Sequence, residues 1–209
     1  MTRAIPATLG FIACGVIGFG LIYFDDPGSL VHFLTFTDFS ISGGKLRFLP
    51  TEGQYWRLLT PIFLHFGWLH IVFNSLWMWE LGGLLERRLG SISLLALVVL
   101  SGIVSNTAQY LWTGPSLFGG LSGVVYALLG FCWIYNWLLP HRRLAVPQGI
   151  IVFMLVWLVL CMVVPTGWLG FGIANAAHLG GLVFGCLAAL PVAASQRSSA
   201  GDRSDGGMS

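Results

Sequence analysis

Charged side chains are scarce in this sequence. Of its 209 residues only 9% are Asp, Glu, Lys or Arg, whereas about 25% are charged in an ordinary soluble domain, and 56% are hydrophobic. This apolar surface is far more than one water-exposed domain could bury. The composition therefore excludes a soluble globular protein and indicates a protein of the lipid bilayer.

Three further absences narrow the function. No basic cluster with interleaved aromatic residues is present, which argues against a nucleic-acid partner. No internal repeat indicates a transporter built from duplicated halves. The cysteines all fall within apolar runs, where a thiol behaves as a small hydrophobe, so a disulfide framework is not expected. They are Cys14, Cys132, Cys161 and Cys186.

Long apolar runs define the expected architecture. Crossing roughly 30 Å of hydrocarbon takes about 20 apolar residues, and the sequence predicts an all-α membrane protein with six transmembrane helices. They cover about residues 4–24, 66–85, 91–111, 122–139, 148–165 and 174–194. One domain, 1–196, is expected, followed by a disordered tail, 197–209, rich in Ser, Gly and Asp.

The arginines predict the orientation of these spans. They gather in alternate connections and at the termini, which places those segments in the cytoplasm by the positive-inside rule. Both termini are then inside. A long loop, 25–64, lies on the outer side, and its many apolar residues predict that it packs on the bundle or lies in the membrane interface. The arginines in these inner segments are Arg3, Arg87, Arg88, Arg142, Arg143, Arg197 and Arg203. The outer loop also carries Lys45, Arg47 and Arg57, but these are offset by Asp25, Asp26, Asp38 and Glu52.

Polar side chains within the spans are costly and therefore candidates for function. They occur at the outer ends of three spans: His65, His70 and Asn74 at the start of the second, Ser122 at the start of the fourth, and Asn175 with His178 in the sixth. Small residues in the fourth and sixth spans predict that these two helices touch. These residues are Gly123, Ala127, Gly130, Ala177, Gly181 and Gly185.

Contact between these helices would bring Ser122 within reach of His178. A neutral imidazole can take the hydroxyl proton as the oxygen attacks a carbonyl, so the pair is a candidate catalytic dyad. No Asp is available as a third member, and stacking on Tyr126 is a candidate means of orienting His178. The backbone N–H of Ser122 with the side chains of His70 and Asn74 could donate to an oxyanion.

A metal site is the alternative use of the histidines. His65, His70 and His178 could in principle collect zinc. His65 and His70, however, are five residues apart and point to different faces, and no His-Glu-x-x-His run exists. We therefore expect no metal and no other cofactor.

Taken together, these motifs resemble the rhomboid family of intramembrane serine proteases. The match is dense from about Trp56 to Leu190. It comprises Trp56-Arg57, His65, His70-x-x-x-Asn74, Leu81-Gly82-Gly83, Glu86-x-Arg88, the block Phe118 to Leu129, and Ala177-His178-x-x-Gly181.

The resemblance implies a role for each matching residue. Ser122 would be the nucleophile, His178 the general base, and His70, Asn74 and the Ser122 amide the oxyanion hole. Tyr126 would position the base, Gly120 would shape the turn at the nucleophile, and Gly123 would support it. It also implies lateral access for the substrate between the second and fifth spans, past Phe73, Phe153 and Trp157.

Two departures from the family pattern stand out. The chain begins three residues before its first basic charge, so we expect no separate cytoplasmic domain before the membrane part. Glu80 lies in the second span where an aromatic residue is usual, and we expect it to find a buried partner or to reach the cytoplasmic interface.

We expect Glu86 and Arg88 to brace the connection between the second and third spans.

The expected function is that of an intramembrane endopeptidase. It would cleave membrane-anchored proteins in or next to their transmembrane helices, from a site open to the periplasmic side of a bacterial inner membrane. Its partners would be such substrates and the lipid bilayer. The alternative is a catalytically silent relative that binds transmembrane helices as an adaptor or chaperone.

Overall fold

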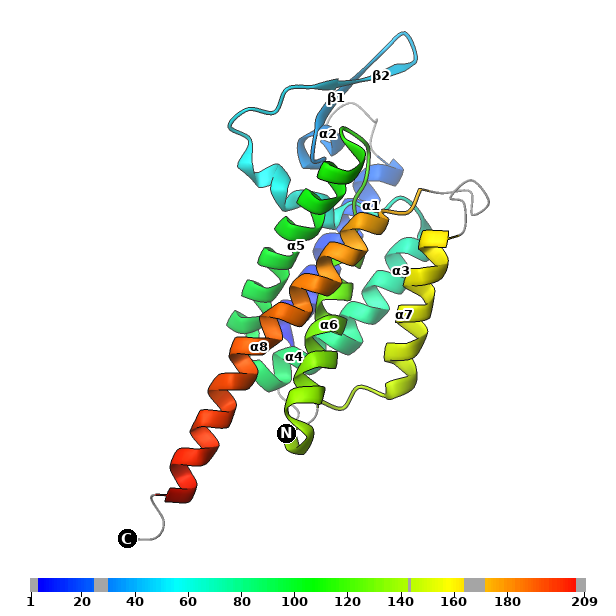
Figure 1. Ribbon diagram of the computed structural model, residues 1–209. Coiled ribbons are helices and arrows are strands. Elements are labelled where there is room, and N and C mark those ends of the chain that lie inside the picture. The colour runs from blue at the N-terminus through cyan, green and yellow to red at the C-terminus, as the bar shows by residue number, and fades with distance from the viewer. Residues whose placement is uncertain (1–3, 25–29, 143, 164–171, 206–209) are drawn as a thin grey trace.

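The computed structural model describes residues 4–24, 30–142, 144–163 and 172–205, and most of this backbone is helical (Figure 1). A bundle of long helices carries a small two-stranded sheet at one end. The elements in chain order are α1 (Pro6–Phe24), α2 (Val31–Leu34), β1 (Asp38–Ser42), β2 (Lys45–Leu49), η1 (Tyr55–Leu58), η2 (Thr60–Phe63), α3 (Trp68–Trp77), the π-helical η3 (Met78–Gly82), α4 (Gly83–Leu89), α5 (Ser91–Thr113), α6 (Ser122–Leu138), η4 (Pro140–Arg142), α7 (Gln148–Val163) and α8 (Asn175–Asp205).

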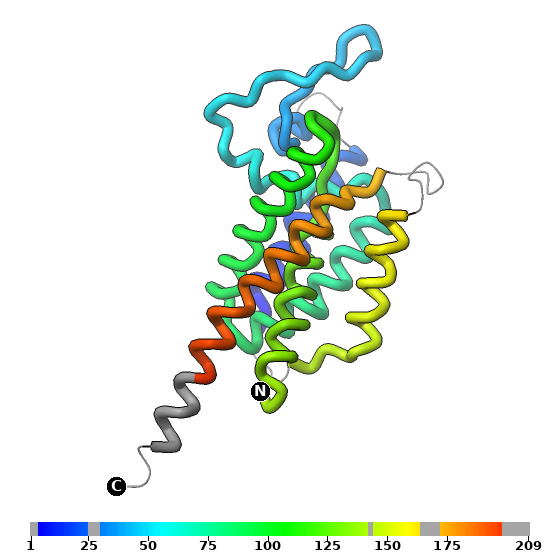
Figure 2. The backbone as a smooth tube through the Cα atoms, viewed as in Figure 1, coloured from blue at the N-terminus to red at the C-terminus, as the bar shows by residue number. Residues whose placement is uncertain are grey.

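The described part of each apolar run is mostly helix in the structure, and residues 164 and 165 of the fifth run lie outside the described residues. The second run is the continuous segment α3–η3–α4, and the others are single helices. By length and composition α1, α5 and the part Asn175–Arg197 of α8 could each cross a membrane, while α6 and α7 are apolar but shorter. Helix α1 begins at the end of the bundle toward which α8 runs from Asn175 (Figure 2).

Helix α8 differs from the sequence expectation at its C-terminal end. The structure has helix as far as Asp205, where we expected a disordered tail from residue 197. Once a helix is nucleated, each added residue gains a hydrogen bond, so a polar continuation can extend an apolar helix. Arg197 also donates to the carbonyl oxygen of Leu138 at the end of α6. Residues 206–209 of the expected tail lie outside the described residues.

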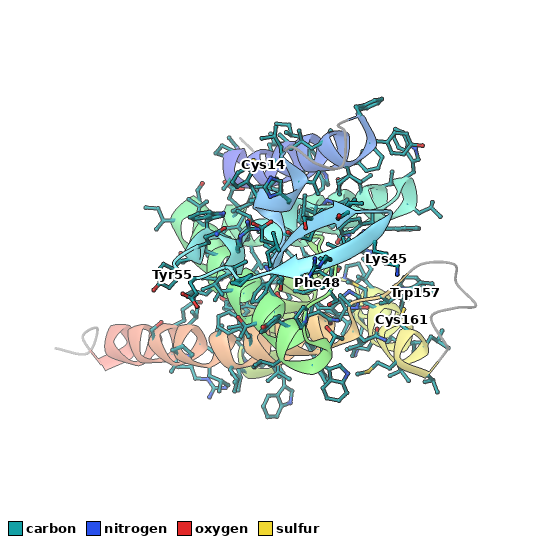
Figure 3. All side chains as sticks on the ribbon, turned by 90° about the horizontal axis from the view of Figure 1, so that it is seen from above. Cys14, Lys45, Phe48, Tyr55, Trp157 and Cys161 are labelled. Carbon is teal, nitrogen blue, oxygen red and sulfur yellow. The ribbon has the colours of Figure 1, made fainter. Side chains whose placement is uncertain are left out.

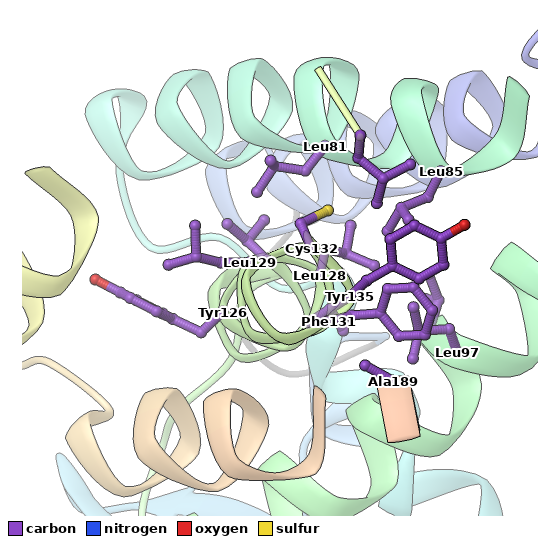
Figure 4. Close-up of a cluster of buried hydrophobic side chains, with 14 of the residues drawn as sticks. Leu81, Leu85, Leu97, Tyr126, Leu128, Leu129, Phe131, Cys132, Tyr135 and Ala189 are labelled. Carbon is purple, nitrogen blue, oxygen red and sulfur yellow. The ribbon is translucent and has the colours of Figure 1, made fainter. Parts of the chain in front are cut away.

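Helix α6 occupies the centre of the bundle (Figure 4). Its side chains are buried on every face from Gly123 to Cys132, and Tyr135 is fully buried as well. A helix that is apolar all round is expected in a core. Leu81 and Leu85 approach it from one side and Leu97 and Ala189 from the others. Ser122 therefore begins a helix that is packed on all sides.

Glu86 ties together the other end of the bundle. Its carboxylate accepts hydrogen bonds from the backbone N–H groups of Ala7 (2.9 Å) and Thr8 (2.8 Å), and from the hydroxyls of Thr8 (2.6 Å) and Ser91 (2.7 Å). Burial alone would raise the pKa of Glu86, but these hydrogen bonds to the charged form hold it below its ordinary value. Glu86 thus braces the connection as expected, whereas Arg88 and Glu80 are exposed and Glu80 has no buried partner among the described residues.

The described part of the loop between the first two apolar runs, residues 30–64, is folded and packed on the bundle. Its centre is Arg57, which is 2% exposed. The guanidinium donates to the carbonyl oxygens of His32 and Thr35, the latter at 2.9 Å, and to Oε1 of Gln54 at 2.7 Å, and forms an ion pair with Asp38 at 3.2 Å. Burial lowers the pKa of Arg57, and Asp38 opposes that effect. The loop is therefore a fixed part of the structure.

A β-hairpin within this loop is an addition to the all-α architecture that we expected. Strands β1 and β2 pair antiparallel, with Phe39 opposite Phe48 and Ile41 opposite Leu46. The hairpin lies at the end of the bundle where α6 and α8 begin (Figure 1). We call this end, defined by Ser122 and Asn175, the site end.

Candidate active site

Ser122 is the first residue of α6 and follows a glycine turn. Gly120 has φ +105°, a conformation that side chains rarely allow, and a Cβ placed there would lie 2.5 Å from Nε2 of His70. The Gly120 N–H donates to the carbonyl oxygen of Pro61 (2.9 Å), which anchors the turn to η2. Glycine is thus required at 120 by both backbone conformation and space.

His65 also supports this turn, through a hydrogen bond to Leu121. The sequence alone did not indicate this role. The N–H of Leu121 donates to its Nε2 at 3.2 Å, and its Nδ1 lies 3.0 Å from the carbonyl oxygen of Phe63. Because Nε2 accepts, the proton must be on Nδ1, which donates to Phe63. His65 is fully buried and is held as a neutral ring beside the nucleophile's backbone.

Helices α6 and α8 pack backbone against backbone. A Cβ on Gly181 would lie 2.0 Å from the carbonyl oxygen of Gly123, and a Cβ on Gly185 would lie 1.9 Å from that of Ala127. Only glycine permits this approach. The prediction that these helices touch is confirmed.

This approach brings Ser122 and His178 together. The Oγ of Ser122 and the Nε2 of His178 are 2.8 Å apart, a normal hydrogen-bond length, although the residues are 56 positions apart in the chain. His178 is 8% exposed. Its Nδ1 is buried and has no hydrogen-bond partner among the described residues. The arrangement is therefore a serine–histidine pair without a carboxylate acting on the imidazole.

Tyr126 lies one turn after Ser122 and contacts the imidazole. The ring centroids of Tyr126 and His178 are 4.9 Å apart, with 36° between the ring planes. The Tyr126 hydroxyl donates to the carbonyl oxygen of Met154 in α7 (3.1 Å), which fixes the orientation of its ring. Ring contact on one face and the Ser122 hydrogen bond on its edge together define the position of His178.

The start of α8 is held by two amide side chains. Oε1 of Gln109, from α5, accepts from the N–H of Ala177 at 3.2 Å, directly before His178. Nδ2 of Asn175 donates to the carbonyl oxygen of Cys161 at 2.7 Å and so links α8 to α7. Asn175 is one of the polar residues that the sequence places at this end of the sixth span, whereas no sequence signal points to Gln109, whose contact is 68 residues distant.

His70 and Asn74 belong to α3, which approaches the Gly120 turn through His70. The Nε2 of His70 lies against Gly120, two residues before the nucleophile. Nδ2 of Asn74 donates one hydrogen to the carbonyl oxygen of His70 at 2.9 Å, which leaves its second hydrogen available, and the residue is 4% exposed. His70 thus lies beside the turn that leads into Ser122, and Asn74 follows one helical turn later, bonded to the His70 carbonyl.

Phe73, Phe153 and Trp157 lie on exposed faces of α3 and α7. About half of each side chain is exposed, and Phe153 stacks on Trp157 with ring centroids 6.5 Å apart. Helix α7 buries a single stripe, formed by Ile151, Met154, Leu158 and Cys161. It is thus more loosely held to the bundle than α6.

Two histidines of the site lie next to each other, and a third contacts the serine. His65 and His70 are adjacent, with ring centroids 5.0 Å apart. Within the described residues, no group of three His, Cys, Asp or Glu side chains is close enough to hold a metal ion. His178 contacts the serine hydroxyl instead.

Comparison with known proteins gives one consistent result. The model of the Rhomboid domain family matches residues 52–195. The chain is 44% identical over 191 residues to a protein named rhomboid protease GlpG from Serratia proteamaculans (strain 568), covering 90% of this chain and 63% of the relative. It is 45% identical over 139 residues to proteins of that name from Yersinia pestis (strain Pestoides F) and Yersinia pseudotuberculosis (serotype O:3, strain YPIII), covering 65% of this chain and 48% of each relative. The chain thus spans about half to two thirds of the length of these relatives.

Proposed function

This chain belongs to the rhomboid family, and we propose that it is an intramembrane serine endopeptidase. The observation that carries the proposal is the 2.8 Å contact between Ser122 Oγ and His178 Nε2. Nucleophile and base are within hydrogen-bond reach, and the base is oriented by Tyr126. The names of the relatives support the same activity.

The proposed reaction proceeds through an acyl-enzyme. Neutral His178 takes the hydroxyl proton at Nε2 while Oγ of Ser122 forms a bond to the substrate carbonyl carbon. The developing oxyanion receives hydrogen bonds from the Ser122 N–H and the side chains of His70 and Asn74. The C–N bond then breaks, and the leaving amine takes the proton from His178. Water, activated by His178 in the same way, hydrolyses the ester and frees Ser122.

The substrate we propose is a membrane-anchored protein whose helix unwinds near the cut. A transmembrane helix hides its carbonyl groups in internal hydrogen bonds, so Ser122 can attack only where they have opened. Substrate reaches the site laterally, between α3 and α7, past Phe73, Phe153 and Trp157. The single buried stripe of α7 supports this route, because few contacts oppose displacement of that helix.

We place the protein in the bacterial inner membrane with six spans and both termini in the cytoplasm. The distribution of arginines supports this orientation. So does the path of the backbone, because α1 begins at the end of the bundle toward which α8 runs, opposite the hairpin (Figure 2). The site end then faces the periplasm, where water for hydrolysis is available.

The decisive experiment compares two catalytic variants with matched controls. The purified full chain in proteoliposomes is expected to cleave a single-span substrate, and Ser122→Ala and His178→Ala should each abolish cleavage. The control variants Ser93→Ala and His141→Ala should retain cleavage, because both residues are exposed and lie away from the site. Full activity in either catalytic variant would refute the dyad.

Covalent labelling separates a protease from a silent adaptor. A fluorophosphonate probe reacts with a serine only if a base activates it. We expect one labelled site, lost in Ser122→Ala. An adaptor that uses the bundle only to bind helices would bind substrate without labelling or cleavage.

A further inference from the structure

The tip of the β1–β2 hairpin, residues 41–47, takes no part in the proposed chemistry and is exposed. Gly43 and Gly44 have φ +58° and +73°, the conformation of a tight two-residue hairpin turn. A Cβ at either position would have no atom within 4 Å. The hairpin therefore projects from the site end as a defined but uncovered element (Figure 1).

One face of the hairpin changes from buried to exposed along its length. Alternate residues of a strand share a face, so Phe39 and Ile41 lie together with Leu46 and Phe48 of the partner strand. Phe39 is 7% exposed, whereas Ile41 is 56% and Leu46 41% exposed. The base of this face packs on the protein, and the cross-strand pair Ile41–Leu46 is left uncovered.

The other face of the tip is basic. Lys45 and Arg47 are both exposed, opposite Ser42 and Ser40 respectively. Asp38 is the sole acidic residue in the sequence of the hairpin, and it is engaged at the base by Arg57 (3.2 Å) and the imidazole of His32 (3.0 Å). The tip thus offers two cations with no carboxylate of the hairpin to neutralise them.

The position of the hairpin and the unpaired edges of its strands both suit the binding of a peptide beside α7. Seen along the bundle from the site end, Lys45 lies on the same side of the molecule as Trp157 and Cys161 of α7, and Tyr55 lies on the opposite side (Figure 3). In a two-stranded sheet each strand has one edge whose backbone groups are unpaired. Such an edge can bind an extended peptide by adding it as a further strand.

We propose that this hairpin is a docking surface for an extended, acidic segment of the substrate that leaves the membrane beside the cut. The inference rests on the proposed function, which requires an unwound substrate at α3 and α7. Charge complementarity favours an acidic peptide over a second copy of this chain, because two such tips would repel each other. Ile41 and Leu46 would contact apolar side chains of the bound segment.

The test uses two single-span substrates that differ only in the outer juxtamembrane segment, which is rich in Asp and Glu in one and in Ser and Asn in the other. The full chain is expected to have a lower KM for the acidic substrate. Two exposed ion pairs predict a ratio of about three- to tenfold. The double variant Lys45→Glu/Arg47→Glu should remove or reverse that ratio with kcat unchanged, and the charge-preserving variant Lys45→Arg/Arg47→Lys should retain it. Equal ratios in the wild type and the charge-reversed variant would overturn the proposal.

Binding without turnover keeps this inference separate from the proposed activity. Full-length Ser122→Ala is titrated with a fluorescent acidic peptide of the juxtamembrane sequence, in nanodiscs of neutral lipid. Weaker binding on charge reversal supports docking even if no substrate is cleaved. If charge reversal weakens peptide binding only in nanodiscs that contain anionic lipid, the hairpin binds lipid head groups and the proposal fails.

Discussion

Substituting Gly181 by Ala is the most direct test of how the fold builds the site. The new Cβ would lie 2.0 Å from the carbonyl oxygen of Gly123, and contacts below 3.0 Å are essentially never seen. Helices α6 and α8 must therefore separate by about 1 Å near Ser122 and His178. Overpacking of this kind costs about 1–3 kcal/mol, and a 1 Å misplacement at a catalytic pair lowers the rate about hundredfold.

The assay measures two quantities on the same purified protein. Cleavage of a single-span substrate should fall about hundredfold, and the thermal midpoint should drop by roughly 2–10 °C. Gly20→Ala is the matched control, because it lies in helix α1 with nothing within 4 Å of the new Cβ, and alanine is the better helix former. If Gly181→Ala equals Gly20→Ala in both readouts, close helix packing does not set the geometry of the dyad.

Three further predictions concern the parts that surround the dyad. Gly120→Ala should lower cleavage about 10²- to 10³-fold, because a Cβ at φ +105° would displace His70 from the oxyanion region; a near-normal rate would remove His70 from that role. The lowered pKa of Glu86 stabilises the fold at every pH above its ordinary value of 4.5, and this stabilisation is lost as the pH falls through the lower pKa of the folded state. Glu86→Gln should therefore lower the free energy of unfolding by about 1–3 kcal/mol at pH 7 and flatten the fall of the thermal midpoint in acid. Parallel curves of thermal midpoint against pH for the wild type and the variant would contradict this. Arg57→Lys cannot reach all the acceptors of the guanidinium, so the outer loop should become sensitive to limited proteolysis while the helices stay protected; an unchanged digestion pattern would show that the network is dispensable.

The helices and the pairing of Ser122 with His178 could be anticipated because they depend on local patterns. Apolar runs locate the helices, and glycines at positions 123, 181 and 185 indicate where two of them approach. The resemblance to a family supplied the roles of His70, Asn74 and Tyr126. These roles remain proposals, and the geometry is compatible with each of them.

Contacts between distant segments could not be anticipated in the same way. Nothing near His65 in the sequence points to the N–H of Leu121, and nothing near Gln109 points to Ala177. Such bonds depend on the packing of whole helices. The hairpin is a different case, since Phe39, Ile41, Leu46 and Phe48 alternate with polar residues around Gly43-Gly44, a recognisable signal that the length of the loop obscured.

The unpartnered Nδ1 of His178 has a consequence for selectivity. In the proposed reaction, no acceptor among the described residues steadies the positive ring that forms when the proton is taken up, so attack on a bound peptide would be slower than with a carboxylate partner. Folded helices that merely pass the site would depart intact. A protein would then be cut in proportion to how long an opened stretch of it dwells beside the serine, which makes local fraying of the target the main source of discrimination.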